Sequence, residues 1–202
     1  MGTEHVMTST NVPSTIASHY ECHQWRHACT ILQQDFPAEW QDIVDVLSSF
    51  TLPKSLILAG GKNKSRIATS IDSAFYSRGW LEKQFETKIQ VDGVESDSPT
   101  HKVDCFRNRV ALELEWSNKD PFFDRDLNNF RLLFELRAVS VGVIITKADE
   151  LADLFRTLGV YSKYGASTTW MKKLIPRIEG GGGGGCPILA FGIKNSLYDP
   201  TT

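Results

Sequence analysis

The sequence predicts an α/β fold in which a mixed central β-sheet is flanked by α-helices. Apolar residues recur at helical spacing over residues 20–35 and 38–50. Residues 108–116 alternate between apolar and polar side chains and form a predicted hairpin with residues 102–106. Residues 139–145 are a β-branched apolar run of the kind that is buried on both faces of a sheet. This order of helices, strands, a helix and a further strand places helices against a mixed sheet.

The chain of 202 residues is expected to form a single domain over residues 1–202, with residues 1–18 as a flexible N-terminus. No apolar run reaches the ~18 residues of a membrane span, and residues 1–18 lack the apolar stretch of a secretory signal. The 4 cysteines are irregularly spaced and do not form a disulfide framework. These features predict reduced thiols, a cytoplasmic location and no membrane partner. The net charge of −2 neither favours nor excludes a nucleic-acid partner.

Turn-forming residues separate the other predicted elements. Before the hairpin, the sequence predicts a loop over residues 54–64 that contains the basic stretch Gly60 to Lys64, a helix over 66–78, a strand over 82–91 and turns over 92–100. After it, the sequence predicts a helix from Asp120-Pro121 to about Leu136, the strand over 139–145, and a flexible linker at the glycine run Gly180 to Gly185.

The hairpin carries acidic residues that can meet. Strict alternation places Glu113 and Glu115 on one face of the strand, opposite its apolar residues. Asp104 lies nine residues before Glu113, and a turn at residues 107–108 returns the chain beside the strand. Oxygen-only ligands of this kind suit Mg²⁺, which also keeps several waters and binds substrate phosphate. The same acids could instead lie on a solvated strand face, and the spacing alone leaves both interpretations open.

A longer pattern surrounds these acids, Val103-Asp-Cys-Phe-Arg-Asn-Arg-Val-Ala-Leu-Glu-Leu-Glu-Trp116. This segment resembles the active-site segment of type II restriction endonucleases of the BglII and BstYI kind, a branch of the PD-(D/E)XK nuclease superfamily. The resemblance extends over roughly residues 66 to 193. It includes the helix around Asp72, the strand Val141 to Ile145 and a C-terminal strand from Cys186 to Ile193. It implies a restriction-endonuclease-like core.

Two positions depart from the family pattern. Glu115 stands where the superfamily usually has lysine and the closest relatives have glutamine, and Asp72 stands where relatives have asparagine. In a metal-assisted phosphodiester hydrolysis, Asp104 and Glu113 would be the principal Mg²⁺ ligands, and Glu115 would ligate metal or orient the attacking water. Asp72 would add a fourth acid, and a second metal held there would offset the missing lysine charge.

Two further segments are candidates for contacting DNA. Asn118 and Lys119 follow the acidic strand, where the resemblance places a base-reading residue, and asparagine can pair bidentately with adenine. A plain turn explains the same residues. The second set combines hydroxyl groups with basic side chains, Ser167, Thr168, Thr169, Lys172 and Lys173. A helix N-cap at Ser167 followed by a solvated basic face explains the second set equally well.

Three function classes agree with these features. The first is a sequence-specific type II restriction endonuclease that cuts double-stranded DNA with Mg²⁺, at a short palindrome related to the GATC core of its relatives. Cutting both strands of a palindrome requires a homodimer. The second is a structure-specific or repair nuclease built on the same core. The third is a DNA-binding module without catalytic activity, or an enzyme that uses its acid pair without metal.

Overall fold

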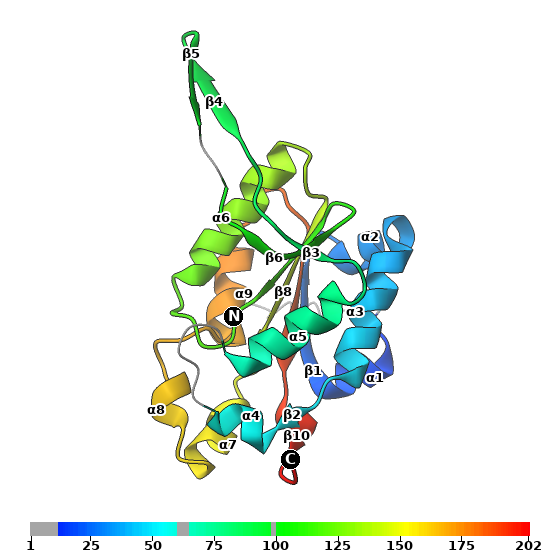
Figure 1. Cartoon of the computed structure of the whole chain (residues 1–202), viewed down its shortest axis with the longest axis vertical. Helices are drawn as coiled ribbons and strands as arrows, with labels where there is room; N and C mark the ends of the chain where they lie inside the picture. Colours follow the sequence, from blue (N-terminus) through cyan, green and yellow to red (C-terminus); the bar gives the residue numbers. More distant parts are fainter. Residues whose placement is uncertain (1–11, 60–64, 98–99) are drawn as a thin grey trace, which may run out of the picture.

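The computed structural model describes residues 12–59, 65–97 and 100–202. A six-stranded sheet forms its centre, in the order β1-β9-β8-β7-β6-β3 (Figure 1). The central strands β7, β8 and β9 are parallel, whereas β1, β6 and β3 pair antiparallel to their neighbours. The predicted α/β class with a mixed sheet is therefore confirmed. Within the described ranges, no helix is long and apolar enough to cross a membrane.

The strands of the central sheet are β1 (Tyr20–Trp25), β3 (Leu81–Lys83), β6 (Val103–Arg107), β7 (Val110–Leu114), β8 (Val141–Lys147) and β9 (Ile188–Ile193). The helices are α1 (Ser14–His19), α2 (Ala28–Asp35), α3 (Pro37–Ser49), α4 (Lys54–Leu58), α5 (Arg66–Tyr76), α6 (Phe122–Glu135), α7 (Leu151–Thr157), α8 (Tyr161–Tyr164) and α9 (Met171–Glu179). Smaller elements are the pair β2 (Leu52–Pro53) and β10 (Tyr198–Asp199), the hairpin β4 (Lys88–Val91) and β5 (Val94–Asp97), and the 3-10 turn Asn195–Leu197.

Helices cover both faces of the sheet, and alternation along the strands supplies an apolar layer to each face. Helices α6 and α9 pack with Ala111 and Ile144 in one layer. The other helices pack with Leu112, Leu114 and Val143 in the second layer. Both central strands β7 and β8 are buried along their whole length, which explains the apolar character of residues 139–145.

The predicted hairpin is confirmed. Strands β6 and β7 pair antiparallel, with Cys105 opposite Leu112. The chain reverses through Asn108 and Arg109, both in the left-handed region with φ of 43° and 69°. This register brings Asp104 beside Glu113, as the sequence predicted.

The prediction of a helix from residue 20 is wrong, because Tyr20–Trp25 is the strand β1, antiparallel to β9. The helix begins only at Ala28, after a left-handed turn at Arg26 and His27 with φ of 54° and 58°. Pairing with the exposed edge of β9 outweighs the helical spacing of these residues. Within the segment predicted as a flexible N-terminus, residues 14–18 lie in α1, and residues 1–11 lie outside the described residues.

The segment between α3 and β6 also differs from its prediction. Residues 54–58 form α4 instead of a loop, whereas Gly60 to Lys64 lies outside the described residues. The single strand predicted over 82–91 is wrong, because the chain leaves the sheet after Lys83 and forms the projecting hairpin β4–β5 (Figure 1). Thr100 closes the base of this hairpin, since its hydroxyl accepts from the amide of Phe85 at 3.0 Å.

The glycine run is a packed turn, so the prediction of a linker there is wrong. Gly183 is buried, and a Cβ atom at this position would lie 2.3 Å from Cδ1 of Ile188. Gly184 has a φ of +58°, and a Cβ there would lie 2.6 Å from Cγ of Arg131 on α6. These glycines allow the chain to pass close beneath α6 before it enters β9.

Candidate active site

Asp104, Glu113 on β7 and Glu115 just after β7 lie together at the end of the hairpin. The Asp104 amide donates to Oε2 of Glu113 at 3.3 Å, and the Leu114 amide donates to Oδ2 of Asp104 at 3.1 Å. Glu113 and Glu115 are each only 1% exposed, while Asp104 is half-buried. The structure thus brings together the three acids to which sequence reasoning assigned catalysis.

Helix α6 adds two residues that sequence reasoning missed, Arg125 and Asp126. Nη2 of Arg125 lies 3.3 Å from Oε1 of Glu115 and 2.7 Å from Oδ1 of Asp126. Asp126 is fully buried, beside the apolar residues Phe123 and Leu127 that face the sheet. In the sequence, Asp126 stands within the apolar stripe of an amphipathic helix. This position could have predicted a buried acid, and a buried acid needs a partner because burial without one is costly.

Burial shifts the pKa values of these acids upward. Burial, followed by repulsion from Asp126, raises the pKa of Glu115 to about 9. Burial is also the main cause that raises the pKa of Glu113 well above its ordinary value, with Asp126 and Asp104 adding repulsion. Burial raises the pKa of Asp126 as well, although Arg125 opposes the shift. The single positive charge of Arg125 therefore cannot neutralise all the carboxylates of this group. A divalent cation would favour their ionised forms.

The donor chemistry of this group fits a hard divalent cation. Oε1 of Glu113, Oε2 of Glu115 and Oδ2 of Asp126 are buried and accept no hydrogen bond from the described residues. Carboxylate oxygens are the ligands that Mg²⁺ prefers. Nevertheless, in the part of the chain that the structure describes, no three His, Cys, Asp or Glu side chains already surround one point closely enough to hold a metal. The guanidinium group of Arg125 lies between Glu115 and Asp126 and takes the place of a cation there.

Asp72 is placed differently from the other predicted ligands. It is buried on α5, and its Oδ1 lies 3.8 Å from Sγ of Cys105. Cys105 belongs to the apolar layer on the α5 side of the sheet, whereas Glu113 and Glu115 lie against residues of α6. Asp72 therefore lies on the α5 side of the hairpin, opposite the face that carries the two glutamates, and its role as a metal ligand stays a prediction.

A pocket of about 170 Å³ lies beside the acids. It is bordered by the start of α5, the end of β7 and α6, and its lining includes Asp104, Glu115, Asn118, Arg125 and His101. Ser65 caps α5 at this point, since its side chain accepts a hydrogen bond from the amide of Ala68. A helix N-terminus is a favourable place for an anion such as phosphate. The pocket therefore combines acids for a metal with groups that suit a phosphate and a base.

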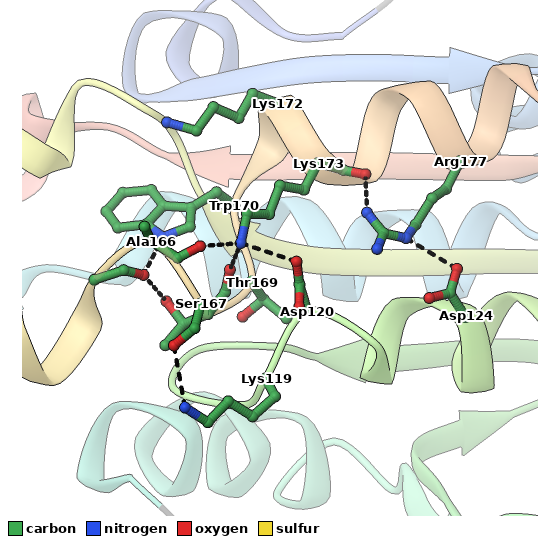
Figure 2. A network of polar contacts seen from close by, with 12 residues as sticks. Lys119, Asp120, Asp124, Ala166, Ser167, Thr169, Trp170, Lys172, Lys173 and Arg177 are labelled. Carbon is green, nitrogen blue, oxygen red and sulfur yellow. Dashed lines mark hydrogen bonds and ion pairs between the residues drawn. The ribbon is translucent and has the colours of Figure 1, made fainter.

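The two candidate DNA-contacting segments lie side by side (Figure 2). Lys119 and Thr168 form an antiparallel bridge, the Thr169 amide donates to the carbonyl of Asn118 at 3.1 Å, and Nζ of Lys119 lies 3.1 Å from Oγ of Ser167. Lys119 and Ser167 are exposed, and Asn118 is half-buried at the pocket. These three side chains are placed where they can reach a ligand.

The threonines of the second segment point inward. The hydroxyl of Thr168 donates to the carbonyl of Tyr164 at 2.9 Å, and the hydroxyl of Thr169 donates to the carbonyl of Glu115 at 3.1 Å. Both residues are buried, so their hydroxyl groups hold the protein together and do not face solvent. The N-cap alternative for Ser167 is wrong, because α9 begins only at Met171 with Trp170 as its N-cap.

The basic residues of this region differ in availability (Figure 2). Nζ of Lys173 donates to Oδ2 of Asp120 and to the carbonyl of Thr168, both at 3.0 Å, and also to the carbonyl of Ala166. Lys172 is exposed, and its Nζ forms a surface ion pair with Asp149 at 3.1 Å and lies 5.8 Å from the ring centroid of Trp170. A phosphate contact is therefore expected from Lys172, whereas Lys173 fastens the loop that precedes its helix.

Comparison with known proteins agrees with this geometry. A family model described as "Restriction endonuclease BglII/BglIII" matches residues 20–193 of the 202-residue chain. A search among curated proteins finds no match. The matched region contains the central sheet from β1 to β9, the acidic hairpin and both candidate DNA-contacting segments. The family implies a nuclease that acts on DNA, and enzymes of this kind generally use divalent metal ions. The chain therefore belongs to the BglII/BglIII family of restriction endonucleases.

Proposed function

We propose that this protein is a type II restriction endonuclease that hydrolyses double-stranded DNA with Mg²⁺ at a short palindrome related to GATC. One observation carries the proposal, namely that the acids Asp104 and Glu115 and the candidate reading residue Asn118 border the same pocket. A nuclease needs the scissile phosphate at its acids while neighbouring side chains contact bases. The adjacency of these groups supplies both requirements at one place.

The acids and Arg125 have different roles in the proposed reaction. When bound, Mg²⁺ would promote ionisation of water and stabilise negative charge on the phosphoryl oxygens. Asp104 and Glu113 would hold the cation, and Glu115 would bind it or accept a hydrogen bond from the attacking water. Asp126 would add negative charge behind them, and Arg125, which lines the pocket, would contact the scissile phosphate.

Digestion of a plasmid of known sequence, with Mg²⁺ and with the fragment ends sequenced, tests the proposal. Discrete fragments whose ends share one palindrome are expected. Preferential cutting of forks, flaps or ends would instead indicate a repair nuclease on the same core. Binding without any cutting would indicate a DNA-binding module, and cutting without divalent metal would refute the metal-dependent mechanism.

A homodimer is the first expected property, because one active site cuts one strand and a palindrome presents two identical sites. We propose that the interface is formed by α6, or by α2 and α3, which correspond to the two helices predicted first in the sequence. Leu132 and Leu136 expose 38% and 54% of their surface on and just after α6, which supports the first choice. Light scattering should give twice the monomer mass at concentrations where both strands are cut. A monomeric mass under those conditions contradicts this prediction.

Asn118→Ala is expected to weaken binding to the cognate site by about 1 to 3 kcal/mol, because one bidentate base contact is lost. Binding to random duplex DNA should remain nearly unchanged, since phosphate contacts are not affected. Titration of both duplexes with Ca²⁺ in place of Mg²⁺ measures the two affinities without cleavage. Equal losses on both duplexes would show that Asn118 has no part in base recognition.

The two adjacent lysines are expected to behave differently. Lys172→Ala should lower the slope of log affinity against log salt by about 0.9, the effect of one lost phosphate contact. Lys173→Ala should leave that slope unchanged and lower the free energy of unfolding by about 1 to 3 kcal/mol, because Asp120 and two carbonyl groups lose their donor. Salt titrations and urea unfolding of both variants provide the comparison. The same reduction of the slope in both variants would contradict the internal role of Lys173.

A further inference from the structure

Lys147, the last residue of β8, is a buried lysine for which the proposed chemistry has no use. It is 0% exposed. Lysine is almost never fully buried, because removing its ammonium group from water costs free energy unless partners replace the hydration. Burial holds the pKa of Lys147 well below its ordinary value. A residue of this kind at the centre of the fold calls for a specific explanation.

The side chain of Lys147 contacts residues within or next to the two candidate DNA-contacting segments. Its Nζ donates to the carbonyl of Trp116 and lies 3.5 Å from Oγ1 of Thr169. It also lies 5.3 Å from the ring centroid of Trp116 and 4.9 Å from that of Trp170, both within the range of a cation–π contact. Trp116 immediately precedes Ser117, and Trp170 immediately follows Thr169. The side-chain amino group of Lys147 therefore lies where one segment begins and the other ends.

Backbone hydrogen bonds also join the two segments farther from Lys147. The Thr169 amide donates to the carbonyl of Asn118, and the Asp120 amide donates to the carbonyl of Ser167, each at 3.1 Å. The hydroxyl of Thr169 links the same place to the carbonyl of Glu115, at the end of the acidic strand. The segments 117–120 and 167–169 thus form one unit, fastened at its inner end by Lys147 and joined there to the catalytic strand.

We propose that Lys147 is a positioning residue for DNA recognition, which holds segments 117–120 and 167–169 as one rigid unit in register with the acidic strand. This proposal rests on the proposed function, because the unit presents Asn118, Lys119 and Ser167 to DNA. A side chain that reads a base must be held within a fraction of an ångström of its hydrogen-bonding geometry. A lysine with two hydrogen-bond partners on different segments fixes that geometry, whereas an apolar residue of equal length would only fill the space.

The test compares Lys147→Met and Thr169→Val with Lys194→Met as the matched control. Methionine keeps most of the length of lysine, and valine keeps the shape of threonine, so each variant removes donors with little change in volume. Lys194 donates to the carbonyl of Ala17 and has no bond to either segment. Thr169→Val keeps the inference testable if Lys147→Met does not fold.

Amide hydrogen exchange provides a readout that does not depend on cleavage. In Lys147→Met and Thr169→Val, the Asp120 and Thr169 amides should exchange at least about tenfold faster, while amides of β8 such as Val143 keep their protection. Faster exchange throughout the sheet, with these two amides not singled out, would show that Lys147 only stabilises the core and would overturn the inference. Unchanged exchange at both amides would overturn it as well.

Cleavage provides the functional readout, on duplexes that carry the site mapped by plasmid digestion and on duplexes with one base pair changed. The ratio of kcat/KM between them should fall at least about tenfold in both variants and remain constant in Lys194→Met. An unchanged ratio would overturn the role in recognition even if exchange increases. If the unmutated enzyme cuts no plasmid, the proposed function fails and the role in recognition fails with it. The exchange result then still decides whether Lys147 fastens the two segments.

Discussion

Glu113→Ala should reduce cleavage by about a thousandfold or more, while the protein remains folded and still binds its cognate site. Loss of a metal ligand removes about 4 kcal/mol of charge stabilisation from the transition state. DNA binding should persist, because removal of a carboxylate from beside the phosphate reduces repulsion there. Initial cleavage rates with Mg²⁺, together with gel-shift titration of the cognate duplex, measure the two properties separately.

Asp153→Ala is the matched control for this experiment, because Asp153 is an exposed acid on α7, away from the acidic site and from α6. Its cleavage rate should equal that of the unmutated protein. Asp104→Asn should behave like Glu113→Ala, since Asp104 is hydrogen-bonded to the same strand beside Glu113. In the unmutated protein, Ca²⁺ in place of Mg²⁺ should also allow binding without cutting. A Glu113→Ala variant that cuts DNA at the original rate would refute the assignment of the active site.

The sequence predicts the centre of this fold well, for a physical reason that β7 and β8 illustrate. Both strands are buried along their length, so their alternation and β-branched residues report directly on where each side chain packs. The register of the hairpin follows from the position of Glu113, nine residues after Asp104, although the turn lies at Asn108 and Arg109, one residue later than predicted. Local patterns suffice where the neighbouring strand is also a neighbour in the chain.

The prediction failed where the partner of a segment lies far away in the chain. Tyr20–Trp25 is a strand because it pairs with β9, about 170 residues later in the chain. No pattern within residues 20–25 predicts this pairing. Asp126 joins the acidic group for the same reason, since only the packing of α6 on the sheet brings it to Glu115. The acceptors of Lys173 on Asp120 and Thr168 were also not predictable, because only the folded loops bring them to its amino group, while its contact with phosphate stays a prediction.

The metal-free protein should lose stability as the pH rises from about 4.5 to about 9, and Glu115→Gln should remove much of that loss. Glu115 ionises near pH 4.5 in the unfolded chain, whereas burial and Asp126 raise its pKa in the folded protein to about 9. The folded state therefore binds more protons than the unfolded state across this interval. The free energy of unfolding must then fall as the pH rises through it.

At pH 8, Glu115→Gln should raise the free energy of unfolding by about 4 to 5 kcal/mol in the absence of metal, and at pH 4.5 by much less. Urea unfolding with a chelator present, at both pH values, measures the difference, and Glu135→Gln is the exposed control. Mg²⁺ should stabilise the unmutated protein more than the variant, because the cation favours the ionised carboxylate that the variant lacks. If Glu115→Gln instead lowers stability at pH 8, the contact between Glu115 and Arg125 outweighs the cost of burial and repulsion. The acids would then be arranged for an ion pair within the protein and not for a metal.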